Sequence, residues 1–284
     1  MIGVIDIGSN SVRLMLIDLG FKQKFVNTTG LARGSMGGIL QKEAMEKTSR
    51  AVKEYCDLAK SYNAKKIYAF ATEAVRSAQN KAEFIDAVKR TADLDIVVVP
   101  SDKEAEMGFK GAYLSDRCLV FDIGGASTEI IVGDENNIYY EKSVPVGVVR
   151  ILDSVNGGAD ETQFIKSKLR EYGDIPTADN YLAIGGTAGS IVSLEEELEP
   201  YDPSVTHLYR LEKSIVCKWM NILHAMPVCK IKDLKGLDDK RAEIIAGGAA
   251  LLYYIMDKLG IDYVTVSEND NLEGFLSCYD IDVI

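Results

Sequence analysis

The stretches VIDIGSNS (residues 4–11) and VFDIGGAS (residues 120–127) repeat one pattern about half the chain length apart. In each copy an apolar, β-branched run ends at an Asp-Ile-Gly turn and a second apolar run follows. This pattern predicts two β-hairpins that share the same small-residue turn. Because the hairpins recur in the same form, the repeat also predicts that the chain consists of two related halves.

Amphipathic helices alternate with strands along the rest of the chain, which predicts an α/β architecture. No low-complexity linker separates the halves, so we place the boundary near residue 116, with domains at residues 1–116 and 117–284. The terminal helix is expected to pack on the first domain. Outside the hairpins, the predicted helices include residues 41–62, 81–94, 161–173 and 239–260, and the predicted strands are residues 66–72, 95–100, 181–186 and 262–267.

Composition narrows the class of protein. The 284 residues are 47% hydrophobic, which is ample for two buried cores. No apolar run approaches the roughly 18 residues of a membrane span, and the first residues form an apolar strand without a basic region, so we do not expect a secretory signal. The five cysteines are scattered without a CxxC pair, which favours free thiols in a reducing cytoplasm. With only two histidines, acid–base chemistry falls to carboxylates.

The formal net charge of −11 argues against a broad nucleic-acid-binding surface. It does not argue against a small anionic ligand. Backbone amides, a few arginines and a metal ion can hold phosphate inside an acidic protein.

Both Asp-Ile-Gly turns expose backbone N–H groups at a glycine bend, a geometry that binds phosphate. Asp6 and Asp122 end their strands and could hold Mg²⁺ directly or through water. Alternatively, each aspartate only caps its own turn. Two matched copies, together with a third turn at Gly185, Gly186 and Thr187, favour the phosphate interpretation. Facing halves would form a cleft with phosphate turns on both sides.

Two further segments carry charged residues of interest. ATEAVRSAQN (residues 71–80) places Arg76 where a helical face could point its bidentate fork at phosphate, although spacing alone favours a solvated face. DKEAE (residues 102–106) offers Glu104 and Glu106 near a helix N-terminus. They are either ordinary first-turn acids or include the base that activates water, and spacing alone does not choose.

Two phosphate turns, a Gly-Gly-Thr turn and a small-residue helix, in this order, resemble the actin-like fold of two ribonuclease H-like domains. Within that fold, the chain is similar to the exopolyphosphatase/guanosine pentaphosphate phosphatase (Ppx/GppA) family. The kinases of the fold lack the ATEAVR stretch. The resemblance is carried by VIDIGSNSVRL, FATEAVRSAQN, SDKEAEMGFKGA, LVFDIGGASTEIIVG, AIGGTAGSIVSL and RAEIIAGGAALL, which span nearly the whole chain.

The resemblance implies Mg²⁺-dependent hydrolysis of a terminal phosphoanhydride in the interdomain cleft. Glu104 would be the base that activates water, and Asp122 and Glu129 the acids associated with Mg²⁺. The resemblance also implies a homodimer, whereas the lack of a long apolar run argues against a membrane partner. The terminal phosphate would be held by the amides of Gly124, Gly125, Ala126 and Ser127, helped by Arg76 and by the turn of Gly8, Ser9, Asn10 and Ser11.

Three departures from the family pattern bear on the substrate. Ala126 replaces a glycine, Glu106 replaces an arginine, and Asp270-Asn271-Leu272-Glu273-Gly274 lacks the arginine of the family's Gly-Leu-Arg-Glu-Gly. The additional C-terminal domains of longer members are also not expected. These differences favour short polyphosphate or pppGpp over long chains. The alternatives are a catalytically weak polyphosphate- or alarmone-binding sensor and, ranked lower, a small-molecule kinase of the same fold.

Overall fold

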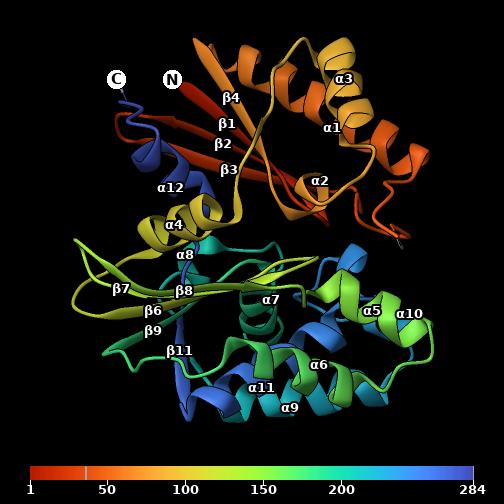
Figure 1. Cartoon of the computed structure of the whole chain (residues 1–284), viewed down its shortest axis with the longest axis vertical. Coiled ribbons are helices and arrows are strands. Elements are labelled where there is room, and N and C mark those ends of the chain that lie inside the picture. The colour runs from red at the N-terminus through yellow and green to blue at the C-terminus, as the bar shows by residue number, and fades with distance from the viewer. Residues whose placement is uncertain (36, 284) are drawn as a thin grey trace. The chain divides into compact units, whose positions relative to one another are not determined.

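The computed structural model describes residues 1–35 and 37–283. The chain divides into two compact units, each built around one mixed β-sheet (Figure 1). Unit 1 comprises Met1–Met107 and Asn271–Ile284, and unit 2 comprises Gly108–Asp270. The α/β architecture predicted from the sequence is confirmed.

The sheet of unit 1 has the order β3-β2-β1-β4-β5. The central strand β1 is buried along its whole length because it pairs antiparallel with β2 and parallel with β4. Strand β3, which the sequence pattern did not predict, extends the first hairpin to three strands. The strands are β1 Ile2–Ile7, β2 Ser11–Asp18, β3 Phe21–Thr28, β4 Lys66–Ala71 and β5 Val97–Val98.

Helices cover both faces of this sheet. Helix α1 lies close to Gly3, where an added Cβ would be 3.3 Å from the Cβ of Ala59. On the other face, the ring of Phe275 from α12 stacks on Phe70 with centroids 4.9 Å apart. At Gly274 an added Cβ would lie 1.7 Å from the carbonyl oxygen of Met107, so only glycine permits this close approach. The helices of unit 1 are α1 Lys42–Ser61, α2 Glu73–Arg76, α3 Lys81–Ala92 and α12 Asn271–Cys278, and α4 Ser101–Ala112 begins in unit 1 and ends in unit 2.

The sheet of unit 2 has the order β10-β11-β9-β6-β7-β8. Its strand β6 pairs antiparallel with β7 and parallel with β9, the same arrangement that β1 has in unit 1. The predicted repeat is therefore a repeat of sheet topology. The strands are β6 Cys118–Ile123, β7 Thr128–Gly133, β8 Ile138–Val144, β9 Asn180–Ile184, β10 Arg210–Glu212 and β11 Tyr263–Val266.

The small residues of α11 let other parts of unit 2 pack against it. An added Cβ would lie 2.9 Å from Ile151 Cγ2 at Gly247 and 3.0 Å from Thr187 Cγ2 at Gly248. None of the helices in the described ranges is long and apolar enough to cross a membrane. The helices are α5 Val148–Asn156, α6 Glu161–Leu169, α7 Gly186–Glu195, α8 Pro203–Thr206, α9 Lys213–Ala225, α10 Val228–Ile231 and α11 Ile245–Leu259, with short 3₁₀ turns at Arg170–Tyr172 and Asp239–Arg241.

Candidate active site

In each unit the predicted site residues gather where parallel strands end. In unit 1, β1, β4 and β5 run parallel, so their carboxyl ends lie at one edge of the sheet. In unit 2, β6 and β9 are parallel and end together in the same way. Open α/β sheets bind ligands at this edge.

The first glycine turn is closed and braced by backbone hydrogen bonds. Gly8 N donates to Ser11 O at 3.0 Å. The carbonyl oxygens of Ser9 and Asn10 accept N–H groups from residues 29–32 at 2.8–3.0 Å. Ser9 and Asn10 are buried, so the turn has a fixed shape.

Asp6 forms an ion pair with Arg13, which lies directly opposite it in the β1–β2 ladder. Arg13 Nε donates to Asp6 Oδ2 at 2.9 Å, and Arg13 Nη2 contacts the same oxygen. Asp6 is buried, which strengthens the pairing. A cation would have to compete with Arg13 for this oxygen, and the metal-binding role of Asp6 stays a prediction.

Arg76 and Glu104, both predicted to be catalytic, are in direct contact within unit 1. Arg76 Nη1 donates to Glu104 Oε2 at 2.7 Å and to the carbonyl oxygen of Val99 at 2.8 Å, while Nη2 donates to Glu73 Oε2 at 2.6 Å. Glu104 is only 5% exposed. Glu106 instead pairs with Lys103 at 2.7 Å, so the structure sets Glu104 apart as the buried acid of this segment.

Burial by itself lowers the pKa of Arg76, but the carboxylates of Glu104 and Glu73 outweigh it and raise the pKa overall. The guanidinium therefore stays charged and holds the Glu104 carboxylate in one orientation. These contacts use three of its five N–H groups. Within the described residues, Nε–H and one Nη2 N–H remain to donate to an anion.

The helical face suggested for residues 71–80 is wrong. Helix α2 ends at Arg76, so the segment has only one short turn of helix. Asn80 instead exchanges two hydrogen bonds with the backbone of Leu40, at 2.9 and 3.0 Å. This pairing anchors the loop before α1.

The second glycine turn has the same closure as the first, with Gly124 N donating to Ser127 O at 3.0 Å. Helix α5 begins beside it, and Val148 N donates to Gly124 O at 3.0 Å. At Gly147 an added Cβ would lie 2.5 Å from the carbonyl carbon of Gly125, so α5 approaches the turn closely.

Ala126 fits the second turn without backbone strain. Its φ is not positive, and the residue is buried. Its carbonyl oxygen accepts from Arg150 Nε at 2.8 Å. The methyl group that replaces the family's glycine is therefore compatible with this backbone.

Asp122 and Glu129 lie directly opposite each other in the β6–β7 ladder. Glu129 is 2% exposed, and its Oε1 accepts from Ser143 Oγ at 2.6 Å. Like charges in this relation destabilise a sheet, and a cation shared by the two carboxylates would relieve the repulsion. Carboxylate oxygens are the ligands that Mg²⁺ prefers, usually completed by water, so this pair fits the ion. The described residues hold no group of three or more histidines, cysteines or acids that could bind a metal by themselves.

The third turn lies beside Asp122 and reveals an arginine that the sequence motifs did not single out. An added Cβ on Gly185, which has φ +87°, would be 2.7 Å from Asp122 Oδ1. On the next residue, Gly186, it would be 2.1 Å from Arg241 Nη2. Thr187 follows in the first turn of α7 and is buried. Arg241 is the first residue of the RAEIIAGGAALL stretch and precedes α11 by a few residues, but nothing in that stretch indicates that its side chain lies next to the Gly186 turn.

The predicted residues thus form one group in each unit. Unit 1 brings together Asp6, the Gly8–Ser11 turn, Arg76 and Glu104, which all lie at or next to one sheet edge. Unit 2 brings together Asp122, Glu129 and the turns at residues 124–127 and 185–187. The cleft between domains stays a prediction.

Comparison with known proteins identifies related sequences. A model of the Ppx/GppA phosphatase family matches residues 4–278. The bifunctional 3-dehydroquinate synthase/phosphatase of Fusobacterium nucleatum is 32% identical over 95% of this chain, but the chain spans only 45% of that protein. Exopolyphosphatase 2 of Mycobacterium tuberculosis is 27% identical over 96% of both chains. The guanosine-5'-triphosphate,3'-diphosphate pyrophosphatase of Aeromonas hydrophila is 25% identical over 96% of this chain and 58% of its own.

Solved structures share the fold over the whole chain. The Ppx/GppA family member of Aquifex aeolicus aligns with a TM-score of 0.77 and 27% identity, over 99% of this chain and 97% of its own. An exopolyphosphatase from Cytophaga hutchinsonii aligns with a TM-score of 0.84 and 22% identity, over 99% of both chains. The two-domain actin-like fold expected from the sequence is confirmed by these matches.

Proposed function

The chain belongs to the Ppx/GppA phosphatase family, and we propose that it hydrolyses terminal phosphoanhydride bonds of short polyphosphate or pppGpp. The observation that carries the proposal is the buried Glu104 carboxylate, held by Arg76 at the carboxyl edge of the unit 1 sheet. The two substrates come from the names of the relatives, an exopolyphosphatase and a guanosine pentaphosphate pyrophosphatase.

In the proposed reaction Glu104 orients a water molecule and accepts its proton. The water oxygen bonds to the terminal phosphorus while the bridging P–O bond breaks, and the shortened chain keeps the electron pair of that bond. Orthophosphate is released. General-base catalysis of this kind contributes about 10²–10⁴-fold to the rate. The two N–H groups of Arg76 that remain would donate to the phosphate being transferred.

Unit 2 supplies the charge-stabilising groups. Asp122 and Glu129 would hold Mg²⁺, which when bound neutralises charge on phosphate oxygens. The N–H groups of the turns at residues 124–127 and 185–187 would donate to phosphate. Arg241 lies beside the second of these turns and suits bidentate phosphate contact.

Glu104→Gln tests the base assignment, with Glu106→Gln as the matched control on the same helix. We expect Glu104→Gln to lower kcat about 10²–10⁴-fold with little change in KM, because the amide cannot accept the proton. Glu106→Gln should keep the wild-type rate because Glu106 pairs with Lys103 instead. Full turnover by Glu104→Gln would refute the assignment.

The substrate is tested by orthophosphate release, measured in parallel on short polyphosphate, long polyphosphate, pppGpp and ATP. We expect release from short polyphosphate or pppGpp to exceed release from the other two. Failure of the wild-type protein to release orthophosphate from any of them would refute the activity. Tight binding without release would instead support the sensor of the same fold.

A further inference from the structure

One face of the unit 1 sheet carries a row of cationic side chains that starts at the first glycine turn. Alternate residues of a strand share a face, and directly paired residues of neighbouring strands do too. Ser11 is paired with Thr28, so β3 reaches the turn at its last residue. Arg13 of β2 and Lys24 and Lys22 of β3 follow on this same face, leading away from the turn.

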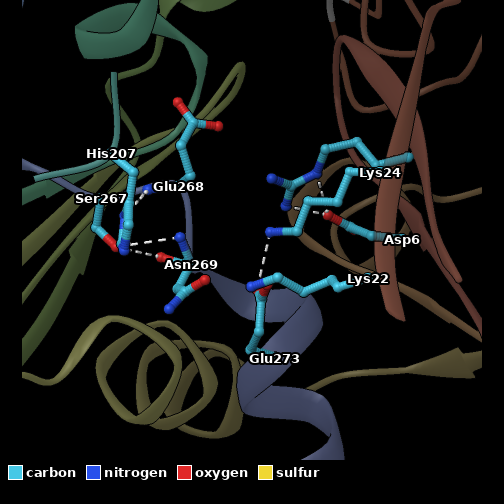
Figure 2. Close-up of polar contacts among 9 residues, drawn as sticks. Asp6, Lys22, Lys24, His207, Ser267, Glu268, Asn269 and Glu273 are labelled. Carbon is cyan, nitrogen blue, oxygen red and sulfur yellow. Dashed lines mark hydrogen bonds and ion pairs between the residues drawn. The ribbon is translucent and has the colours of Figure 1, made fainter. Parts of the chain in front are cut away.

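The two lysines reach the terminal helix of the same unit (Figure 2). Lys24 Nζ lies 2.8 Å from Glu273 Oε2, and Lys22 Nζ lies 3.1 Å from Glu273 Oε1. The side chains of Lys24 and Lys22 are 21% and 43% exposed, so both ammonium-bearing chains are partly accessible. An ammonium group has three donors, so one lysine can contact more than one anionic oxygen.

The lysines of the row lie close to the place where the family motif has an arginine and this chain does not. Leu272 occupies its position and is fully buried in the apolar core with Phe70 and Phe275. That position therefore presents no charge. The neighbouring Glu273 meets lysines from β3, so in this chain the positive charge beside α12 comes from the hairpin.

We propose that Arg13, Lys24 and Lys22 bind the phosphates that follow the terminal phosphate of a polyphosphate chain. The proposal rests on the proposed function, since it assumes that the terminal phosphate occupies the site beside the Gly8–Ser11 turn. From Thr28 to Lys22 the row spans about 20 Å at the usual rise of a strand. Because the row is finite, affinity should increase with chain length and then level off once a chain fills it.

The test is the full-length double variant Lys22→Gln/Lys24→Gln, assayed on tripolyphosphate and on chains of about fifteen phosphates, which exceed the row. We expect KM for the longer chain to rise about tenfold more than KM for tripolyphosphate, as for the loss of two partly exposed charge pairs. The control is Lys42→Gln/Lys47→Gln. These lysines are exposed on α1, which packs on the opposite face of the sheet, and their loss should change neither KM.

Glu273→Gln separates ligand binding from a purely structural role. If the lysines only fasten α12, Glu273→Gln and the lysine double variant should behave alike, with lower Tm and no dependence on chain length. If the lysines bind phosphate, Glu273→Gln should bind the longer chain at least as tightly as wild type, because it removes a competing carboxylate. Added salt should also weaken binding of the longer chain more in wild type than in the lysine variant.

Three results would overturn the proposal: an equal KM change on both chain lengths, no change on either, or matching behaviour of Glu273→Gln and the lysine variant. If wild type hydrolyses no polyphosphate, the proposed function fails, but the row is still tested. In that case calorimetric titration with inorganic polyphosphate of about fifteen phosphates compares wild type with the double variant. Equal affinities would refute the row, and weaker binding by the variant would support it.

Discussion

At the first glycine turn Arg13 lies opposite Asp6, whereas at the second turn Glu129 lies opposite Asp122. The positions correspond in the two ladders, so one substitution converts a neutralised carboxylate into a pair of carboxylates. The first turn therefore suits direct contact with an anion, and the second suits a shared cation. The difference shows how two copies of one backbone can carry different charge patterns.

The backbones of the two turns agree closely. Gly8 N to Ser11 O and Gly124 N to Ser127 O are both 3.0 Å. An added Cβ would lie 3.1 Å from Ser11 O at Gly8 and 3.0 Å from Ser127 O at Gly124. The two turns thus share their backbone shape but differ in the charge of their side chains. Shape and charge can each be tested by substitution.

The largest expected effect is a loss of activity on substitution of Asp122 at the second glycine turn. Asp122→Asn should lower the Mg²⁺-dependent rate about 10²–10³-fold and raise the Mg²⁺ concentration for half-maximal activity, because one of two proposed ligands loses its charge. Titration of Mg²⁺ in the phosphate-release assay measures both. Asp179→Asn, at an exposed site in the same unit, is the control. A wild-type Mg²⁺ response in Asp122→Asn would remove the distinction between the turns.

In the absence of metal, removing a charged side chain should lower the free energy of unfolding at the first turn but not at the second. Arg13→Met removes the partner of a buried aspartate and should lower the free energy of unfolding by about 3 kcal/mol. Glu129→Gln relieves repulsion with Asp122 and should leave that free energy unchanged or raise it by about 0.5 kcal/mol. Urea denaturation measures both. Destabilisation of similar size by both variants would contradict the assignment.

The last prediction concerns the backbone shape of the two turns, not their charge. Gly8→Ala and Gly124→Ala each bring a methyl group close to a backbone oxygen, and each should cost about 1–2 kcal/mol of unfolding free energy. Because the two turns have the same backbone geometry, we expect the two variants to lose the same amount of unfolding free energy. Urea denaturation of the two variants, each compared with wild type, shows whether the turns tolerate a Cβ to the same extent. Costs that differ by more than about 1 kcal/mol would show that the turns differ in backbone as well as charge.

The sequence predicts the hairpins and their turns because both depend on local patterns. The Asp-Ile-Gly repeat places Asp6 and Asp122 at equivalent strand ends, and the structure has them there. The run of alanines and glycines at residues 246–250 predicts a helix that other elements approach closely. The short contacts of Gly247 with Ile151 and of Gly248 with Thr187 confirm this. These features need only neighbouring residues to be recognised.

Features that depend on distant residues were not predictable. Strand β3 reads FKQKFVNT, whose polar residues give no clean alternation, and it forms through pairing with β2. Lys24 meets Glu273 across 249 residues of sequence. Arg241 meets the turn at Gly186 only after the strands and helices between them are in place. In each case the partner is set by the tertiary fold.

Helix α12 belongs to unit 1, although all of unit 2 precedes it in the chain. During synthesis, unit 2 can therefore be complete before the last residues of unit 1 have been made. Until Leu272 and Phe275 arrive, Phe70 and its neighbours lack part of their apolar cover. We therefore expect the nascent N-terminal segment of unit 1 to be the part of the chain most prone to aggregation. Its core is completed only when α12 packs against Phe70.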